Sequence, residues 1–149
     1  MSADKPKKLL YEELTYRIRG AMFAVHQALG PGHKQSLRSS PPEADAGLKE
    51  GVYHKALSKE FEIRNIPFIS EKIVDVIYKS EKVGVYRPDF IVDDKVVIEI
   101  KAVPFLIKGA EVQMSYYLRG TQYQLGLLVN FGSKTLDIRR RIYSISANP

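Results

Sequence analysis

An apolar strand-like segment, a helical segment and a second apolar segment follow one another between residues 95 and 130. Lys95 to Lys101 is rich in β-branched residues and predicts a strand. Residues 108–120 predict a helix, and Tyr123 to Asn130 predicts a buried strand. A strand, a helical crossover and a further strand commonly lie in one sheet, with the helix packed on a face of that sheet. Residues 73–101 predict a meander of three strands before the helix, and a meander followed by a helical crossover predicts a mixed sheet flanked by helices.

The rest of the chain supplies two helices before this unit and further strands around it. The predicted elements are a helix over 10–29, a helix over about 47–64, strands over 73–78 and about 83–92, and a last strand over 136–145. Gly30, Pro31 and Gly32 predict the end of the first helix. The order α-α-β-β-β-α-β-β predicts an α/β or α+β domain.

Length and composition predict a single domain. The chain has 149 residues, so one core is expected over 9–149, preceded by a flexible leader at 1–8 and interrupted by an inserted surface loop at 33–46. There is no cysteine, which excludes disulfides and thiolate metal sites. The sequence has no stretch apolar enough for a membrane span and no secretory segment, so we expect a cytoplasmic protein.

Charged residues interrupt two of the predicted strands. Alternation places Glu99 and Lys101 on one face of the strand over 95–101, and Asp89 interrupts an apolar row of the preceding strand. A turn at residues 93–94 makes these strands neighbours, so Asp89 should approach Glu99. Two buried carboxylates are costly unless a positive charge lies beside them. The residues alone leave two alternatives open: a divalent cation, or an ion pair with Lys101 or Arg87.

Several short motifs resemble those of a known superfamily of nucleases. Pro88-Asp89 followed by Glu99-Ile100-Lys101 resembles the signature of the PD-(D/E)xK nuclease superfamily. The segment 47–53, GLKEGVY, resembles the GxxExxY signature of one family of small prokaryotic proteins in that superfamily. Residues 113–117, QMSYY, resemble the QxxxY element of RecB-like nucleases. The resemblance implies a restriction-endonuclease-like core, a mixed β-sheet flanked by helices.

The same resemblance implies a site for divalent-metal-dependent hydrolysis of phosphodiester bonds. It assigns the carboxylates of Asp89 and Glu99 and the backbone carbonyl of Ile100 as ligands of Mg²⁺ or Mn²⁺, which prefer oxygen ligands. It assigns to Lys101 the orientation or deprotonation of the attacking water. Glu50 would act as a further ligand through water or would orient Lys101. Without the motif, Glu50 is an ordinary exposed helix carboxylate.

Three further residues have supporting roles in this interpretation. Tyr53 lies three residues after Glu50 and would line the same cleft, although a core tyrosine fits the sequence equally. Gln113 and Tyr117 share one helical face and would contact strand ends or substrate. The alternative is a surface amide beside a core aromatic residue.

The charge balance favours a polyanionic partner. The chain has 23 Lys and Arg against 17 Asp and Glu, a net charge of +6, which favours binding to a polyanion such as nucleic acid. The resemblance to the nuclease superfamily makes DNA the expected substrate. The candidate nucleic-acid-binding residues are Arg87, Lys108, Arg119, Arg139, Arg140 and Arg141. The arginine run 139–141 is also typical of a solvated edge strand. The sequence leaves open whether the protein forms a homodimer, and the competing hypothesis is a catalytically silent nucleic-acid-binding or protein-binding module on the same scaffold.

Overall fold

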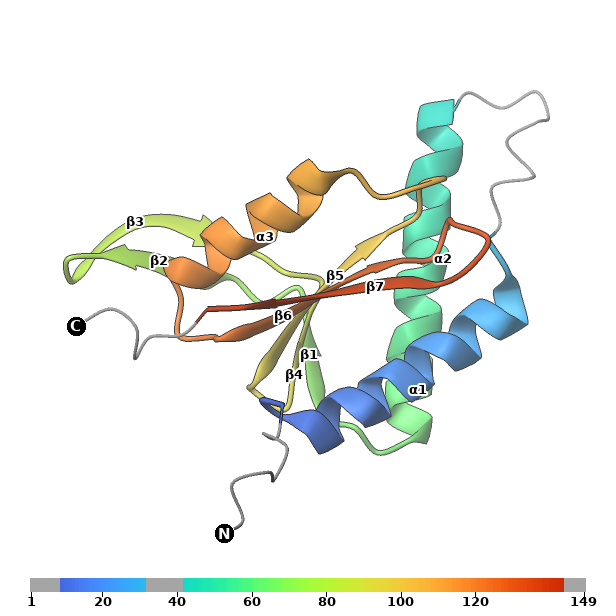
Figure 1. Cartoon of the computed structure of the whole chain (residues 1–149), viewed down its shortest axis with the longest axis horizontal. Coiled ribbons are helices and arrows are strands. Elements are labelled where there is room, and N and C mark those ends of the chain that lie inside the picture. The colour runs from blue at the N-terminus through green and yellow to red at the C-terminus, as the bar shows by residue number, and fades with distance from the viewer. Residues whose placement is uncertain (1–8, 32–41, 144–149) are drawn as a thin grey trace, which may run out of the picture.

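The computed structural model describes residues 9–31 and 42–143 (Figure 1). The predicted leader at 1–8 and residues 33–41 of the predicted loop lie outside the described residues. The elements are, in order, α1 (Glu12–Leu29), α2 (Pro42–Ile63), β1 (Phe68–Ser70), β2 (Val74–Tyr78), β3 (Glu81–Tyr86), β4 (Phe90–Val92), β5 (Val96–Lys101), α3 (Lys108–Arg119), β6 (Leu125–Asn130) and β7 (Asp137–Ile142).

The main sheet has five strands in the order β1-β4-β5-β6-β7. β5 and β6 are parallel, joined by α3 as the crossover helix, and the other neighbouring pairs are antiparallel. The predicted mixed sheet with flanking helices is therefore confirmed, and the fold is consistent with the restriction-endonuclease-like class. β5 lies at the centre of this sheet, so its residues are covered from both faces.

Helices cover the two faces of the main sheet, and the residues of β5 alternate between them (Figure 1). Val96, Ile98 and Ile100 pack in one core cluster with buried residues of α1 and α2. Val97 belongs to a second cluster that contains Met114 and Leu118 of α3. Glu99 and Lys101 follow Val97 on the α3 face, because strand side chains alternate with a period of two. The structure thus confirms the predicted placement of the two charged side chains on one face.

The predicted strand over 83–92 is wrong in one respect, because the structure divides it into two strands. β3 ends at Tyr86 and pairs with β2 in a separate two-stranded sheet, whereas β4 starts at Phe90 in the main sheet. Pro88 lies between them and has no N–H to donate to a ladder. The alternation therefore restarts after Pro88, and five strands precede α3 where the sequence predicted three.

The predicted end of α1 agrees with the structure, whereas α2 begins earlier than predicted. α1 ends at Leu29, and Gly30 has a φ of 70°, a conformation that glycine adopts without strain. α2 begins at Pro42, five residues before the predicted start at Gly47, so the end of the predicted loop is helical. Proline fits the first turn of a helix because the N–H that it lacks would have no partner in the helix.

The β2–β3 hairpin is held on the end of α3. The amide of Ile77 donates to the carbonyl of Gly120 at 2.9 Å. A side chain at Gly120 would place its Cβ 2.4 Å from Cγ1 of Val76, so only glycine allows this approach. Lys79 and Ser80 both have positive φ at the tip of the hairpin, as a tight two-residue turn requires.

No helix in the described ranges has the length and apolar character that crossing a bilayer requires.

Candidate active site

β4 and β5 separate at the point where the sequence places its first candidate carboxylate. Phe90 is the first residue of β4 and pairs with Ile98. Two residues further along β5, the amide of Ile100 donates to Oδ2 of Asp89 at 2.6 Å, so a side chain replaces the backbone partner. Backbone N–H groups of a strand lie in the plane of its sheet. The carboxylate of Asp89 is therefore held at the open edge of β5.

The backbone of Ile100 presents a second oxygen at this edge. In a β-strand the N–H and C=O of one residue point to the same side of the strand. Because the Ile100 amide points toward Asp89, its carbonyl points toward the same edge. The carbonyl of Lys101, by contrast, accepts from the amide of Phe131 at 2.8 Å on the β6 side. A carboxylate and a carbonyl thus meet where β4 leaves β5.

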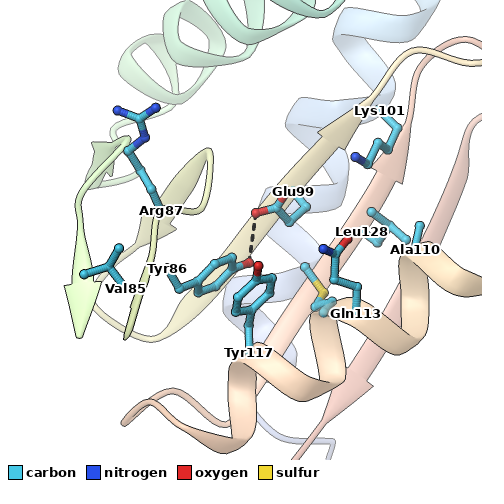
Figure 2. Close-up of a pocket in the computed structure, with 10 residues that line it drawn as sticks. Val85, Tyr86, Arg87, Glu99, Lys101, Ala110, Gln113, Tyr117 and Leu128 are labelled. Carbon is cyan, nitrogen blue, oxygen red and sulfur yellow. Dashed lines mark hydrogen bonds between the residues drawn. The ribbon is translucent and has the colours of Figure 1, made fainter. Parts of the chain in front are cut away.

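Glu99 and Lys101 line a pocket of about 250 Å³ between the end of β5 and α3 (Figure 2). The Lys101 side chain extends toward Glu99, and Gln113 and Tyr117 form the α3 side of the pocket. These four residues were all predicted to lie in or beside the site. The structure brings them together on the face of β5 that alternation indicated.

Tyr86 completes this pocket, and sequence reasoning did not find it. Its hydroxyl donates to Oε1 of Glu99 at 2.9 Å, and its ring stacks on Tyr117 with 4.2 Å between the centroids (Figure 2). An unbroken strand over 83–92 would place Tyr86 and Asp89 on opposite faces. The break at Pro88 removes that constraint. Only a prediction of this break could have placed Tyr86 at the site.

Glu50 reaches Asp89 from the other face of the sheet. Glu50 of α2 lines a second pocket, of about 380 Å³, together with His54, Asp89 and Ile100. His54 stacks on Phe90 with 4.4 Å between the ring centroids, and its Nε2 lies 3.3 Å from the backbone oxygen of Asp89. Asp89 therefore lies between the layer of Glu50 and the layer of Glu99. His54 follows Glu50 by one helical turn, which was the signal available in the sequence.

The carboxylates of the site favour their protonated forms more than ordinary carboxylates do. Burial, followed by the charge of Asp89, raises the pKa of Glu99 to about 7. Burial also raises the pKa of Asp89, although the bond from the Ile100 amide opposes the shift. The pKa of Glu50 is raised chiefly by burial as well. The Lys101 charge lowers the pKa of each of these groups, so one ammonium acts on all three acids.

The ion-pair alternative finds no support in the described part of the chain. There, neither Lys101 nor Arg87 forms an ion pair within 4.0 Å, and neither does Asp89 or Glu99. Figure 2 shows the Arg87 side chain directed away from Glu99. The carboxylates therefore share the field of Lys101 without a direct partner of opposite charge.

Tyr53 lies in the core, where it joins α1 to α2. Its side chain is 2% exposed, its ring stacks on Phe131 with 4.8 Å between the centroids, and its hydroxyl donates to the carbonyl of Gly30. These contacts fix the C-terminal end of α1 against α2. Tyr53 thereby orients the helix that carries Glu50, while neither pocket at the site is lined by its side chain.

The candidate nucleic-acid-binding residues fall into two groups. Arg139 pairs with Glu111 at 2.6 Å, and Arg141 donates to the hydroxyl of Ser115 at 2.7 Å, both on α3. Arg140 points to the opposite face and donates to the carbonyl of Leu10 at 2.7 Å. The remaining three side chains are exposed, namely Arg87, Lys108 and Arg119. The arginine run therefore has structural partners, and its role in binding stays a prediction.

The oxygen donors of the site suit a hard divalent cation that takes few ligands from the protein. Among the side chains that the structure describes, in 9–31 and 50–143, no three acidic or histidine groups gather closely enough to hold a metal together. Mg²⁺, however, usually binds one or two carboxylates and keeps several waters. Asp89, Glu99 and the Ile100 carbonyl supply such a set, and burial of both acids gives a cation a favourable electrostatic environment.

These observations define an α/β protein with two acids and a lysine at the diverging edge of a mixed sheet. The chain belongs to the PD-(D/E)XK nuclease superfamily, whose profile matches residues 42–142. The match spans α2 to β7 and includes every residue assigned to the candidate site. No curated protein and no solved structure matches the chain.

The raised pKa of Glu99 predicts how stability depends on pH without metal. The folded-state pKa of about 7 exceeds the reference value of 4.5, so the folded protein binds this proton more tightly than the unfolded chain does. We therefore expect the free energy of unfolding in EDTA to fall as pH rises from 4.5 to about 7. Urea unfolding at about pH 5 and about pH 8 measures this difference in the free energy of unfolding. Glu99→Gln should flatten this slope, and an equal slope in the variant would contradict the assignment.

Proposed function

We propose that this protein is a divalent-metal-dependent nuclease that hydrolyses phosphodiester bonds of DNA. The observation that carries the proposal is that Asp89, held by the Ile100 amide at the open edge of β5, acts electrostatically on Glu99, whose pocket also contains Lys101. Membership of the PD-(D/E)XK nuclease superfamily supports nuclease activity in general. The metal and the substrate are the parts that we add from the chemistry of the site.

Each residue of the site has a distinct role in the proposal. Asp89, Glu99 and the Ile100 carbonyl hold Mg²⁺ or Mn²⁺, and Tyr86 fixes the Glu99 carboxylate through its hydrogen bond. The bound cation supplies Lewis-acid activation of the phosphodiester and of water. The ammonium of Lys101 orients the attacking water and offsets the charge that develops on the phosphate oxygens.

Glu50 and the α3 residues act around this centre. Glu50 influences Lys101 electrostatically from the α2 side, and we assign to it the positioning of that ammonium or ligation through water. Gln113 is exposed at the pocket and contacts the substrate in this proposal. The segment GLKEGVY places the chain, in our proposal, in the GxxExxY family of this superfamily.

The exposed cations suit the phosphate backbone of a nucleic acid, and DNA is the polymer that we propose within that class. The net charge of +6 favours binding to nucleic acid independently of sequence. Arg87 lines the pocket of Glu99, and Lys108 lies at the start of α3. Contacts of this kind position a backbone and carry no sequence information directly.

Cleavage of plasmid and linear DNA with Mg²⁺ or Mn²⁺ tests the proposal. We expect wild-type protein to cut, EDTA to stop cutting, and Asp89→Asn and Glu99→Gln to lose both cleavage and Mn²⁺ uptake, since each removes a charged ligand. The matched control is Glu62→Gln, an exposed carboxylate of α2, which should cut normally. DNA binding without cleavage under any metal would favour the silent module, and cleavage unchanged in both site variants would refute the assignment.

A further inference from the structure

β3 has an open edge on the outside of the molecule. Within the described ranges, the smaller sheet contains only β2 and β3, so each strand has one neighbour. The other side of β2 meets the end of α3, where Ile77 donates to Gly120. No strand lies along the other side of β3 in the described part of the chain, and Figure 1 shows the hairpin projecting from the main sheet. Such open edges are templates for pairing with another chain.

One face of β3 and its extension carries a charge pattern that complements itself. Glu81, Val83 and Val85 are exposed and alternate on one face of β3. Arg87, the first residue after the strand, is also exposed and points away from Glu99 as Val85 does (Figure 2). Val83 is 61% and Val85 53% exposed, which is unusual for valines in a strand. The row therefore reads acid, apolar, apolar, base from one end to the other.

The charges at the two ends of this row have no partner in the described part of the chain. Neither Glu81 nor Arg87 forms an ion pair there, although the neighbouring Lys82 pairs with Asp75 across the hairpin at 3.4 Å. Figure 2 shows Val85 and Arg87 pointing away from Glu99, while Tyr86 points toward it. Val85 and Arg87 also line the pocket of Glu99, so this end of the exposed row reaches the rim of the site.

We propose that two copies of this chain pair through β3 in an antiparallel, two-fold symmetric arrangement centred on Gly84. In that register Val83 lies opposite the partner's Val85, and Glu81 lies opposite the partner's Arg87. The two-fold axis makes each of these contacts occur twice in the dimer. The result is a continuous four-stranded sheet built from two hairpins.

The chemistry of the row selects a second copy over an unrelated strand. Opposite charges facing each other across antiparallel strands are stabilising, and like charges are destabilising. The row matches itself only when antiparallel, because a parallel copy would place acid beside acid and base beside base. Gly84 has no atom within 4 Å of the position that a Cβ would occupy, so the centre of the register is open.

Pairing of this kind would place two sites on either side of one symmetry axis. β3 continues directly through Arg87 and Pro88 into Asp89, so the active-site edge of each copy lies a few residues from the shared sheet. The proposal stands independently of nuclease activity, since it concerns assembly alone. Its test is therefore made without metal or nucleic acid.

Charge-reversal variants test the register by sedimentation. We expect wild-type protein to be a dimer whose dissociation follows mass action. Glu81→Arg and Arg87→Glu should each weaken the dimer by at least about tenfold, because each places two like-charge pairs across the axis. An equimolar mixture of the two variants should dimerise again, since every contact then joins opposite charges. The matched controls are Glu62→Arg and Lys59→Glu, exposed on α2, which should leave the dimer unchanged.

Three outcomes would overturn the proposal. A wild-type protein that stays monomeric at about 100 µM has no such interface. A dimer that resists both single variants uses another surface, and a mixture that fails to restore association rejects the register.

Hydrogen exchange of the wild type answers the same question if a variant does not fold. Backbone amides of β3 should exchange more slowly at about 100 µM than at about 1 µM, while those of β2 stay unchanged. Exchange in β3 that is independent of concentration would equally reject the proposal.

Discussion

We expect the Lys101→Met protein to cleave DNA at least about 100-fold more slowly than wild type, while its Mn²⁺ affinity stays the same or rises. Removal of a group that orients water or stabilises developing charge commonly costs about 10²- to 10⁴-fold in rate. Lys101 also repels a cation, because its charge acts on Glu50, Asp89 and Glu99 alike. Single-turnover cleavage and Mn²⁺ titration measure the two effects separately.

The matched control for this prediction is Lys59→Met on the exposed surface of α2. It removes the same charge at a residue that lines neither pocket of the site, so its cleavage rate should stay within about twofold of wild type. A Lys101→Met protein that cleaves at the wild-type rate would show that this ammonium takes no part in the chemistry. Loss of Mn²⁺ binding together with cleavage would instead indicate a damaged site.

Asn130→Ala should lower the free energy of unfolding by about 3 kcal/mol or more, because it leaves several buried groups without partners. Asn130 is fully buried at the end of β6. Its side chain accepts from the amides of Val103 and Gly132 at 3.0 and 3.1 Å and donates to the Val103 carbonyl at 2.9 Å. Urea unfolding measures the loss.

A second variant of Asn130, with a side chain of nearly the same size, separates the loss of hydrogen bonds from the loss of volume. Asn130→Asp keeps the accepting oxygen and loses the donor to Val103, so we expect a loss that reflects both the missing donor and a buried charge. Gln27→Ala, exposed on α1, is the control and should change stability by less than about 0.5 kcal/mol. If Asn130→Ala leaves the free energy of unfolding unchanged, water must replace its hydrogen bonds to the backbone of Val103 and Gly132.

Much of the candidate site was predictable because it depends on local pattern. The alternation of Val97, Glu99 and Lys101 indicated a shared face, and the structure places all three on the α3 side of β5. Gln113 and Tyr117 share a helical face by their spacing, and both line the pocket. Periodicity survives folding because strand and helix geometry is the same wherever the element packs.

The parts that were missed depend on contacts between distant segments. Tyr86 lies at Glu99 because the chain leaves one sheet at Pro88 and enters another, a change that no local period reports. His54 has no metal-ligand spacing to another histidine in the sequence, yet it packs on Phe90 beside Asp89. Tyr53 has the spacing of a site residue, and the packing of α1 on α2 places it in the core.

The sequence by itself determined which chemistry this chain can offer: two carboxylates and a lysine on adjoining strands, without cysteine, on a basic domain. It also determined the faces of β5, since alternation is a property of the backbone. Only the tertiary structure decided that Asp89 lies in the plane of the sheet, held by the Ile100 amide, between the layers of Glu50 and Glu99. The physical reason is that β4 and β5 pair over only three residues and part beyond the Phe90–Ile98 pair, and where strands part depends on the packing of the whole sheet.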